Sequence, residues 1–190
     1  LIETSRSEYA RSKLGIWLFL GSEVLFFSGL FVAYGVFRAN HYALFHYAHH
    51  FLDWRMGALN TVVLVGSSVS AAWSVRCAQL GQRKGLRLSL LLTLLLAGAF
   101  LVVKYFEYSA KFHHGWLPGT NTFLAIYFTL TGLHGLHVIG GMGVNAWLWG
   151  PGSALWKTDP QHFTNRVENA GLFWHLVDLV WIFLFPVLYL

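Results

Sequence analysis

Charged residues and cysteines are both scarce in this chain of 190 residues. Only 11% of the residues are charged and 56% are hydrophobic, whereas soluble domains carry about 25% charged residues. This composition excludes an ordinary soluble domain and indicates an integral membrane protein. The single cysteine, Cys77, excludes an internal disulfide and a metal site built from several cysteines.

The sequence also lacks a glycine-rich phosphate loop, a nucleophile elbow and a Cys-Cys metal motif. We therefore predict no catalytic residue in this chain, and no motif assigns any residue as a metal ligand. The net charge of +5 does not predict a nucleic-acid partner, because Lys and Arg lie mainly in the connections between apolar runs. We expect no cleavable signal peptide, because the first apolar run is too long for one.

Five apolar runs are long enough to cross the roughly 30 Å of hydrocarbon in a bilayer. Lipid offers no partners to backbone amides and no strand-like alternation is present, so these runs are expected to be helices. We predict one all-α domain over residues 1–190, a polytopic bundle of five transmembrane helices. The predicted spans are 14–37, 58–80, 86–106, 121–149 and 168–190, the fourth being overlong.

The basic residues predict the orientation of the bundle. If successive spans cross the membrane in alternate directions, nine Lys and Arg residues lie on the same side of the membrane as the N-terminus and four lie on the opposite side. Because positive loops stay inside, we expect a cytoplasmic N-terminus and a periplasmic C-terminus.

Small residues in two spans predict how the helices pack. The fourth span is rich in glycine, which lets neighbouring membrane helices approach closely. The second span offers short polar side chains for hydrogen bonds between helices, namely Asn60, Thr61, Ser67, Ser68 and Ser70.

Ionisable residues inside the spans are the main candidates for a functional site. They are Glu23, His134, His137, His175 and Asp178. Such groups cost several kcal/mol in lipid unless they face protein or find partners. A spacing of three residues places each close pair on one helix face, and a rise of about 1.5 Å per residue puts all five at similar depth. A hydrogen-bond network, a proton-handling site and haem or metal ligation all remain open.

Polar residues near the ends of the spans have simpler interpretations. Glu107 lies between Lys104 and Lys111, and this spacing predicts a solvated helix face with ion pairs at the membrane–water interface. Glu168 is expected to open the fifth helix, where a negative charge favours the helix dipole. His162 and Arg166 are placed to meet lipid phosphate. Six histidines on the outer side could bind copper or zinc; they are His41, His46, His49, His50, His113 and His114.

Several stretches, in order along nearly the whole chain, resemble subunit III of the haem–copper terminal oxidases. They include KLGIWLFLGSEVLFF (13–27), Leu59-Asn60-Thr61 with Ser67-Ser68, and Phe106-Glu107-Tyr108. YFTLTGLHGLHV (127–138) and FWHLVDLVWI (173–182), the latter preceded by Glu168, are the most specific.

The resemblance implies a non-catalytic subunit that packs against the catalytic subunit I of a terminal oxidase in a bacterial inner membrane. It implies haem and copper in that partner, none in this chain, and bound phospholipids. Glu23 matches a carbodiimide-reactive glutamate linked to proton uptake, and His162 matches a histidine that contacts a lipid headgroup. Many members have seven helices, whereas some bacterial members lack the first two. With five predicted spans, this chain resembles the five-helix bacterial type.

The electron donor stays open at this point. Similar subunits accompany cytochrome c oxidases, quinol oxidases and nitric oxide reductases. The rival hypothesis is a stand-alone membrane cytochrome or metalloenzyme that uses His134, His137 and His175 as ligands.

Overall fold

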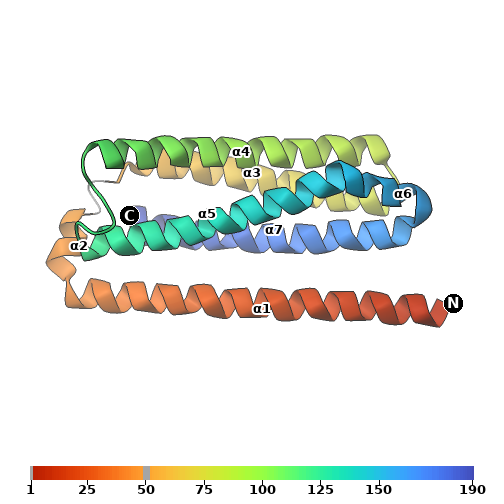
Figure 1. Cartoon of the computed structure of the whole chain (residues 1–190), viewed down its shortest axis with the longest axis horizontal. Helices are drawn as coiled ribbons and strands as arrows, with labels where there is room; N and C mark the ends of the chain where they lie inside the picture. Colours follow the sequence, from red (N-terminus) through yellow and green to blue (C-terminus); the bar gives the residue numbers. More distant parts are fainter. Residues whose placement is uncertain (1, 49–51) are drawn as a thin grey trace.

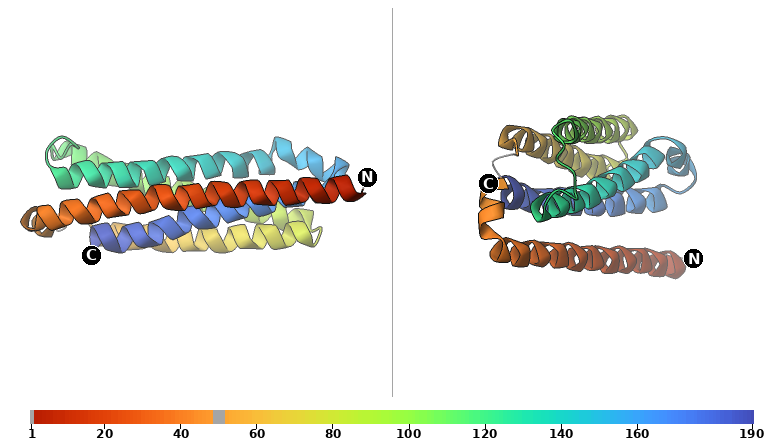
Figure 2. Two further views of the ribbon diagram at one scale, coloured as in Figure 1. Left: turned by 90° about the horizontal axis from the view of Figure 1, so that it is seen from below. Right: turned by 60° about the vertical axis from the view of Figure 1, so that its left-hand side comes forward.

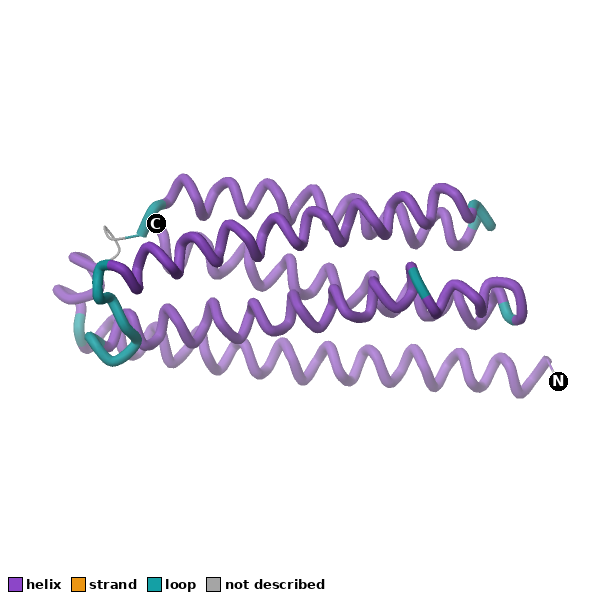
Figure 3. The backbone as a smooth tube through the Cα atoms, turned by 45° about the horizontal axis from the view of Figure 1, so that its top comes forward, coloured by secondary structure: helices purple, strands orange, loops and turns teal. Residues whose placement is uncertain are grey.

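The computed structural model describes residues 2–48 and 52–190, with side chains described for 9–47 and 52–190. Within these ranges the chain forms helices joined by short loops, and no strand (Figure 3). The long helices are α1 (Ile2–Asn40), α3 (Trp54–Gln79), α4 (Arg83–His113), α5 (Thr122–Trp149) and α7 (Pro160–Tyr189). The short ones are α2 (Tyr42–Ala48), η2 (Pro151–Ala154) and α6 (Leu155–Thr158). Five stretches of the described chain are long and apolar enough to span a membrane, which confirms the predicted five-helix bundle.

The long helices run nearly parallel or antiparallel along one axis, with the two termini at opposite ends (Figures 1 and 2). α3 packs mainly on α4 and α7, and α5 packs on both α4 and α7. These four helices form a core around large side chains that are less than 2% exposed, among them Trp174, Trp181, Tyr127 and Phe100. α1 lies along one side of this core, where it contacts α7 and, more sparsely, α5.

Side-chain caps fix where the helices begin. Asn121 accepts a hydrogen bond from the backbone of Leu124 (2.8 Å) at the start of α5. Asp159 accepts one from the backbone of His162 (3.0 Å), and Pro160 follows it at the first helical position. The prediction that the last helix opens at Glu168 is therefore wrong, because α7 starts eight residues earlier. The cap, rather than the apolar run, marks its beginning.

The glycines of α5 do not act as the sequence predicts, with one exception. A Cβ atom on Gly141 would lie 2.7 Å from the ring of Trp174, so this glycine does allow α5 and α7 to approach. A Cβ atom on Gly132, Gly135, Gly140 or Gly143 would meet nothing within 4 Å. The prediction of a general packing role for these glycines is wrong within this chain, because a side chain at any of these four positions would contact no neighbouring atom.

The small polar residues of α3 do form hydrogen bonds to neighbouring helices, as predicted. The indole N–H of Trp181 donates to Thr61 and that of Trp174 to Ser67, each at 3.1 Å. Ser70 shares a hydrogen bond of 2.7 Å with Thr93 of α4. Asn60 differs, because its buried amide has no hydrogen-bond partner among the described residues.

Candidate functional site

Glu23 of α1 and His137 of α5 form a hydrogen-bonded pair between their helices within the membrane-spanning region. The carboxylate oxygen Oε2 lies 2.9 Å from Nε2 of the imidazole, and the side chains are 18% and 21% exposed. The other ring nitrogen, Nδ1, lies 2.7 Å from the backbone oxygen of Leu133. A carbonyl oxygen only accepts hydrogen bonds, so Nδ1 carries a hydrogen.

This geometry fixes what the pair can do chemically. With Nδ1 protonated, a hydrogen bond between Nε2 and Glu23 needs one more proton, on either the carboxyl group or the imidazole. The neutral pair and the ion pair differ only in the position of that proton. Glu23 and His137 together therefore form a site that holds one transferable proton.

The other predicted members of the polar layer do not join this pair. His175 shares a hydrogen bond of 2.7 Å with Ser68 of α3. Asp178 is 3% exposed and its carboxylate has no hydrogen-bond partner among the described residues. His134 is fully buried against the rings of Phe100 and Trp181, at centroid distances of 5.7 and 5.3 Å, and neither ring nitrogen has a described partner.

No group of three His, Cys, Asp or Glu residues in the described part of the chain is arranged to hold a metal ion. Two of the outer histidines, His49 and His50, lie outside the described residues. Of the three histidines in the rival ligand set, two have other partners: His137 contacts Glu23 and His175 contacts Ser68.

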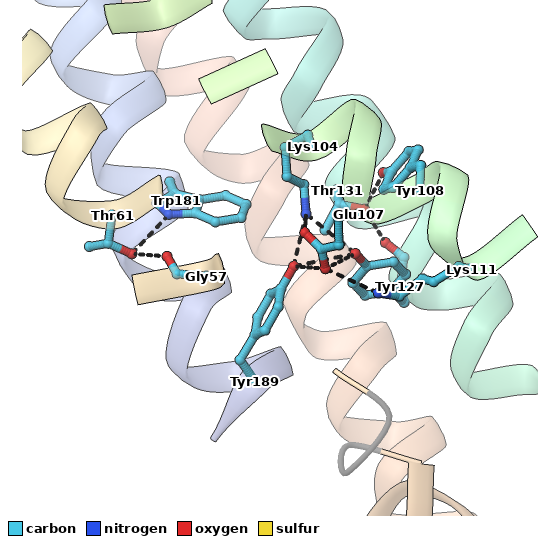
Figure 4. A network of polar contacts seen from close by, with 10 residues as sticks. All are labelled: Gly57, Thr61, Lys104, Glu107, Tyr108, Lys111, Tyr127, Thr131, Trp181 and Tyr189. Carbon is cyan, nitrogen blue, oxygen red and sulfur yellow. Dashed lines mark hydrogen bonds and ion pairs between the residues drawn. The ribbon is translucent and has the colours of Figure 1, made fainter. Parts of the chain in front are cut away.

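The most extensive polar cluster of the bundle surrounds Glu107 (Figure 4). Its oxygen Oε1 accepts hydrogen bonds from Tyr189 (2.6 Å), Tyr127 (2.7 Å) and Lys111 (3.1 Å). Oε2 accepts from Lys104 (2.9 Å), which also donates to Tyr189 (2.8 Å) and Tyr127 (3.3 Å). We call these five residues the Glu107 cluster.

The Glu107 cluster corrects the prediction of a solvated ion-pair face. The ion pairs exist, but the side chains of Lys104, Glu107 and Lys111 are only 8%, 2% and 5% exposed. The spacing along α4 indicates the ion pairs. It does not indicate that Tyr127 and Tyr189, 20 and 82 residues further along the chain, cover them.

Glu168 lies inside α7, and the predicted capping role is therefore wrong. Its carboxylate accepts hydrogen bonds from Lys13 (2.7 Å), Gln79 (2.9 Å) and Tyr9 (3.3 Å). It thus connects α7 to both α1 and α3 at the end of the bundle that holds the N-terminus.

His162 and Arg166 are exposed near the same end of the bundle. The guanidinium group of Arg166 lies 5.3 Å from the ring centroid of Trp147. Arg166 also borders a groove of about 460 Å³ between α1, α5 and α7. The groove is mainly apolar, with lining residues that include Ile16, Phe19, Gly140, Trp147 and Phe173.

Five membrane-length helices with charged pairs in their interior define a polytopic membrane protein. Comparison with known proteins is more specific. The family described as "Cytochrome c oxidase subunit III" matches residues 9–190, and the chain belongs to this family. Membership makes it a subunit of a terminal oxidase complex.

Individual relatives are similar over most of their length. The chain is 33% identical to "Probable cytochrome c oxidase subunit 3" of Nocardia farcinica, covering 93% of this chain and 86% of the relative. It is 33% identical to "Cytochrome c oxidase subunit 3" of Corynebacterium diphtheriae over the same shares. "Quinol oxidase subunit 3" of Bacillus spizizenii is 32% identical, with 93% and 85% covered.

Proposed function

We propose that this chain is the non-catalytic subunit III of a proton-pumping haem–copper oxidase in a bacterial inner membrane. Its N-terminus lies in the cytoplasm, as the distribution of basic residues predicts. It stabilises the catalytic subunit, holds phospholipid and supports proton uptake. Cytochrome c is the proposed electron donor; quinol is the alternative, because relatives named for both donors are about equally similar.

The Glu23–His137 pair carries the proposed role in proton uptake. It can hold one proton between two groups, and its side chains are about one-fifth exposed on the outside of the bundle, where a partner subunit can reach them. A donor that recovers its proton quickly supports uptake by a partner subunit during turnover. Haem and copper, which supply the redox chemistry, belong to that partner in this proposal.

The variant Glu23→Gln tests this role, because an amide cannot exchange a proton with His137. We expect the assembled oxidase to turn over more slowly, pump fewer protons per electron and survive fewer turnovers. Asp159→Asn is a matched control: it also removes one carboxylate but keeps a good helix cap. Parent-like values of all three quantities in Glu23→Gln rule out the role.

The groove beside Arg166 supports the proposal of bound phospholipid. Its apolar lining suits an acyl chain, and Arg166 at its border can pair with a phosphate group. His162 lies one helical turn before Arg166 and is also exposed. Lipid analysis of the purified complex tests this: Arg166→Gln should lower the retained phospholipid, whereas unchanged retention contradicts it.

Co-purification in mild detergent tests membership of the complex directly. We expect a haem-containing catalytic chain to co-purify with this one, and this chain to show no haem absorption once it is separated. Haem bands that stay with the isolated chain would favour the rival hypothesis of a membrane cytochrome.

A further inference from the structure

A row of polar side chains leads along α5 from the Glu23–His137 pair toward the Glu107 cluster. His137, His134, Thr131 and Tyr127 follow one another at spacings of three, three and four residues, which places them along one face of the helix. At about 1.5 Å per residue, they cover roughly 15 Å along the axis. This row joins the middle of the bundle to the end that holds the C-terminus.

Each member of the row carries a ring nitrogen or a hydroxyl group that can accept or donate a hydrogen bond. His134 has two ring nitrogens without a described hydrogen-bond partner. The hydroxyl group of Thr131 contacts that of Tyr108 and donates to the backbone oxygen of Tyr127 at 2.7 Å. Tyr127 in turn donates to Glu107. A row of this kind invites proton leakage across the membrane unless something blocks it.

The Glu107 cluster has the charge to block it. Two ammonium groups face one carboxylate, so the cluster carries a net positive charge when its tyrosines are neutral. Lys104 uses all three of its N–H groups, on Glu107, Tyr127 and Tyr189, which fixes the charge in place (Figure 4). The rings of Trp181 and Tyr108 lie 5.1 and 5.5 Å from the same nitrogen and surround it further.

We propose that the Glu107 cluster is an electrostatic barrier that stops protons held at the Glu23–His137 pair from crossing to the opposite end of the bundle. A fixed positive charge repels an approaching proton most strongly where the surroundings are dry, because the interaction grows as the dielectric constant falls. Positive groups exclude protons from membrane pores in this way. The barrier rests on the proposed proton-holding role of the Glu23–His137 pair.

Passive proton flux in vesicles that contain the complete oxidase tests the barrier. A pH difference is imposed without electron donor, and its decay is followed with an internal pH dye. Lys104→Gln leaves Glu107 paired with Lys111, so the cluster becomes neutral while the amide still hydrogen-bonds to the tyrosines. We expect its proton flux to rise about tenfold, because the barrier loses the repulsion of one nearby positive charge. Lys104→Arg keeps the charge and should match the parent.

Further variants make the outcomes decisive. Equal flux in Lys104→Gln and the parent overturns the barrier. If the oxidase that carries Lys104→Gln no longer retains this subunit, Lys111→Gln is measured instead, because it neutralises the same cluster. If neither variant is retained in the oxidase, the cluster is purely structural, and the barrier proposal is overturned. Adding Glu23→Gln to Lys104→Gln should return the flux to the parent level. Because Glu23→Gln alone is judged by turnover and pumping, failure of the proposed function is distinguishable from failure of the barrier.

Discussion

The four-helix core and α1 are held in place in different ways. In the core, 44% of the residues in the most apolar stretch of α7 are buried, whereas only 11% of those in the corresponding stretch of α1 are. The core encloses large aromatic side chains and the Glu107 cluster, in which every charge has a partner. α1 instead reaches the core through polar contacts at three levels along its length: Lys13 with Glu168, Glu23 with His137, and Tyr34 with the backbone of Val187.

This difference shows which interactions hold each part of the bundle in place. Lipid tails are as apolar as side chains, so burying an apolar surface contributes little to helix association, and packing and hydrogen bonds take over. The core uses both means. α1 combines polar contacts at these three levels with a few buried side chains such as Phe27, and most of its apolar surface stays exposed, where lipid and other subunits of the oxidase can contact it.

The largest effect is expected in the core, from Glu107→Gln. The substitution leaves two buried ammonium groups without a carboxylate, and breaking a buried charge pair costs about 3–5 kcal/mol. Unfolding of the full-length chain in detergent micelles, followed by circular dichroism, measures the loss. Glu23→Gln is the matched control on α1, and its cost should be clearly smaller, because its pair is more exposed.

Equal losses of stability in these two variants would contradict the distinction between core and α1. A loss confined to Glu23→Gln would reverse it, and would make α1 the element on which the bundle depends.

A medium effect is expected from Gly141→Ala. The new methyl group would lie 2.7 Å from the ring of Trp174, and overpacking of this kind costs about 1–3 kcal/mol. Gly140→Ala is the control, because its methyl group meets nothing within 4 Å. Thermal unfolding of both variants gives the comparison, and a similar drop in both would show that helix propensity or lipid contact, rather than packing in the core, decides the cost.

The sequence predicts the number of spans and their helical structure, because length and apolarity are local properties that lipid enforces. It also identifies Glu23 and His137 as members of one layer, since depth follows from position along a helix. It does not predict that these two meet while His175 and Asp178 stay apart from them. That outcome depends on the rotation of each helix about its axis, which the sequence pattern leaves open.

The Glu107 cluster and Glu168 illustrate two further limits of the sequence. Lys104 and Lys111 lie near the end of a span, where long side chains usually reach water; only the fold brings Tyr127 and Tyr189 over them. The start of α7 is indicated by Asp159 and Pro160, but their signal lies outside the apolar run. A helix that starts at this cap has Glu168 in its interior.

The smallest effect is expected from Tyr34→Phe. It removes the 2.7 Å hydrogen bond from α1 to the backbone oxygen of Val187, which is worth about 0.5–1.5 kcal/mol. Tyr105→Phe is the control, because that side chain is 70% exposed and its ring contact with Phe106 survives the change. Unfolding in micelles should separate the two variants slightly. A loss as large as that of Glu107→Gln would mean that α1 unfolds together with the core, so that its polar contacts do not form a separate attachment but belong to one cooperative unit.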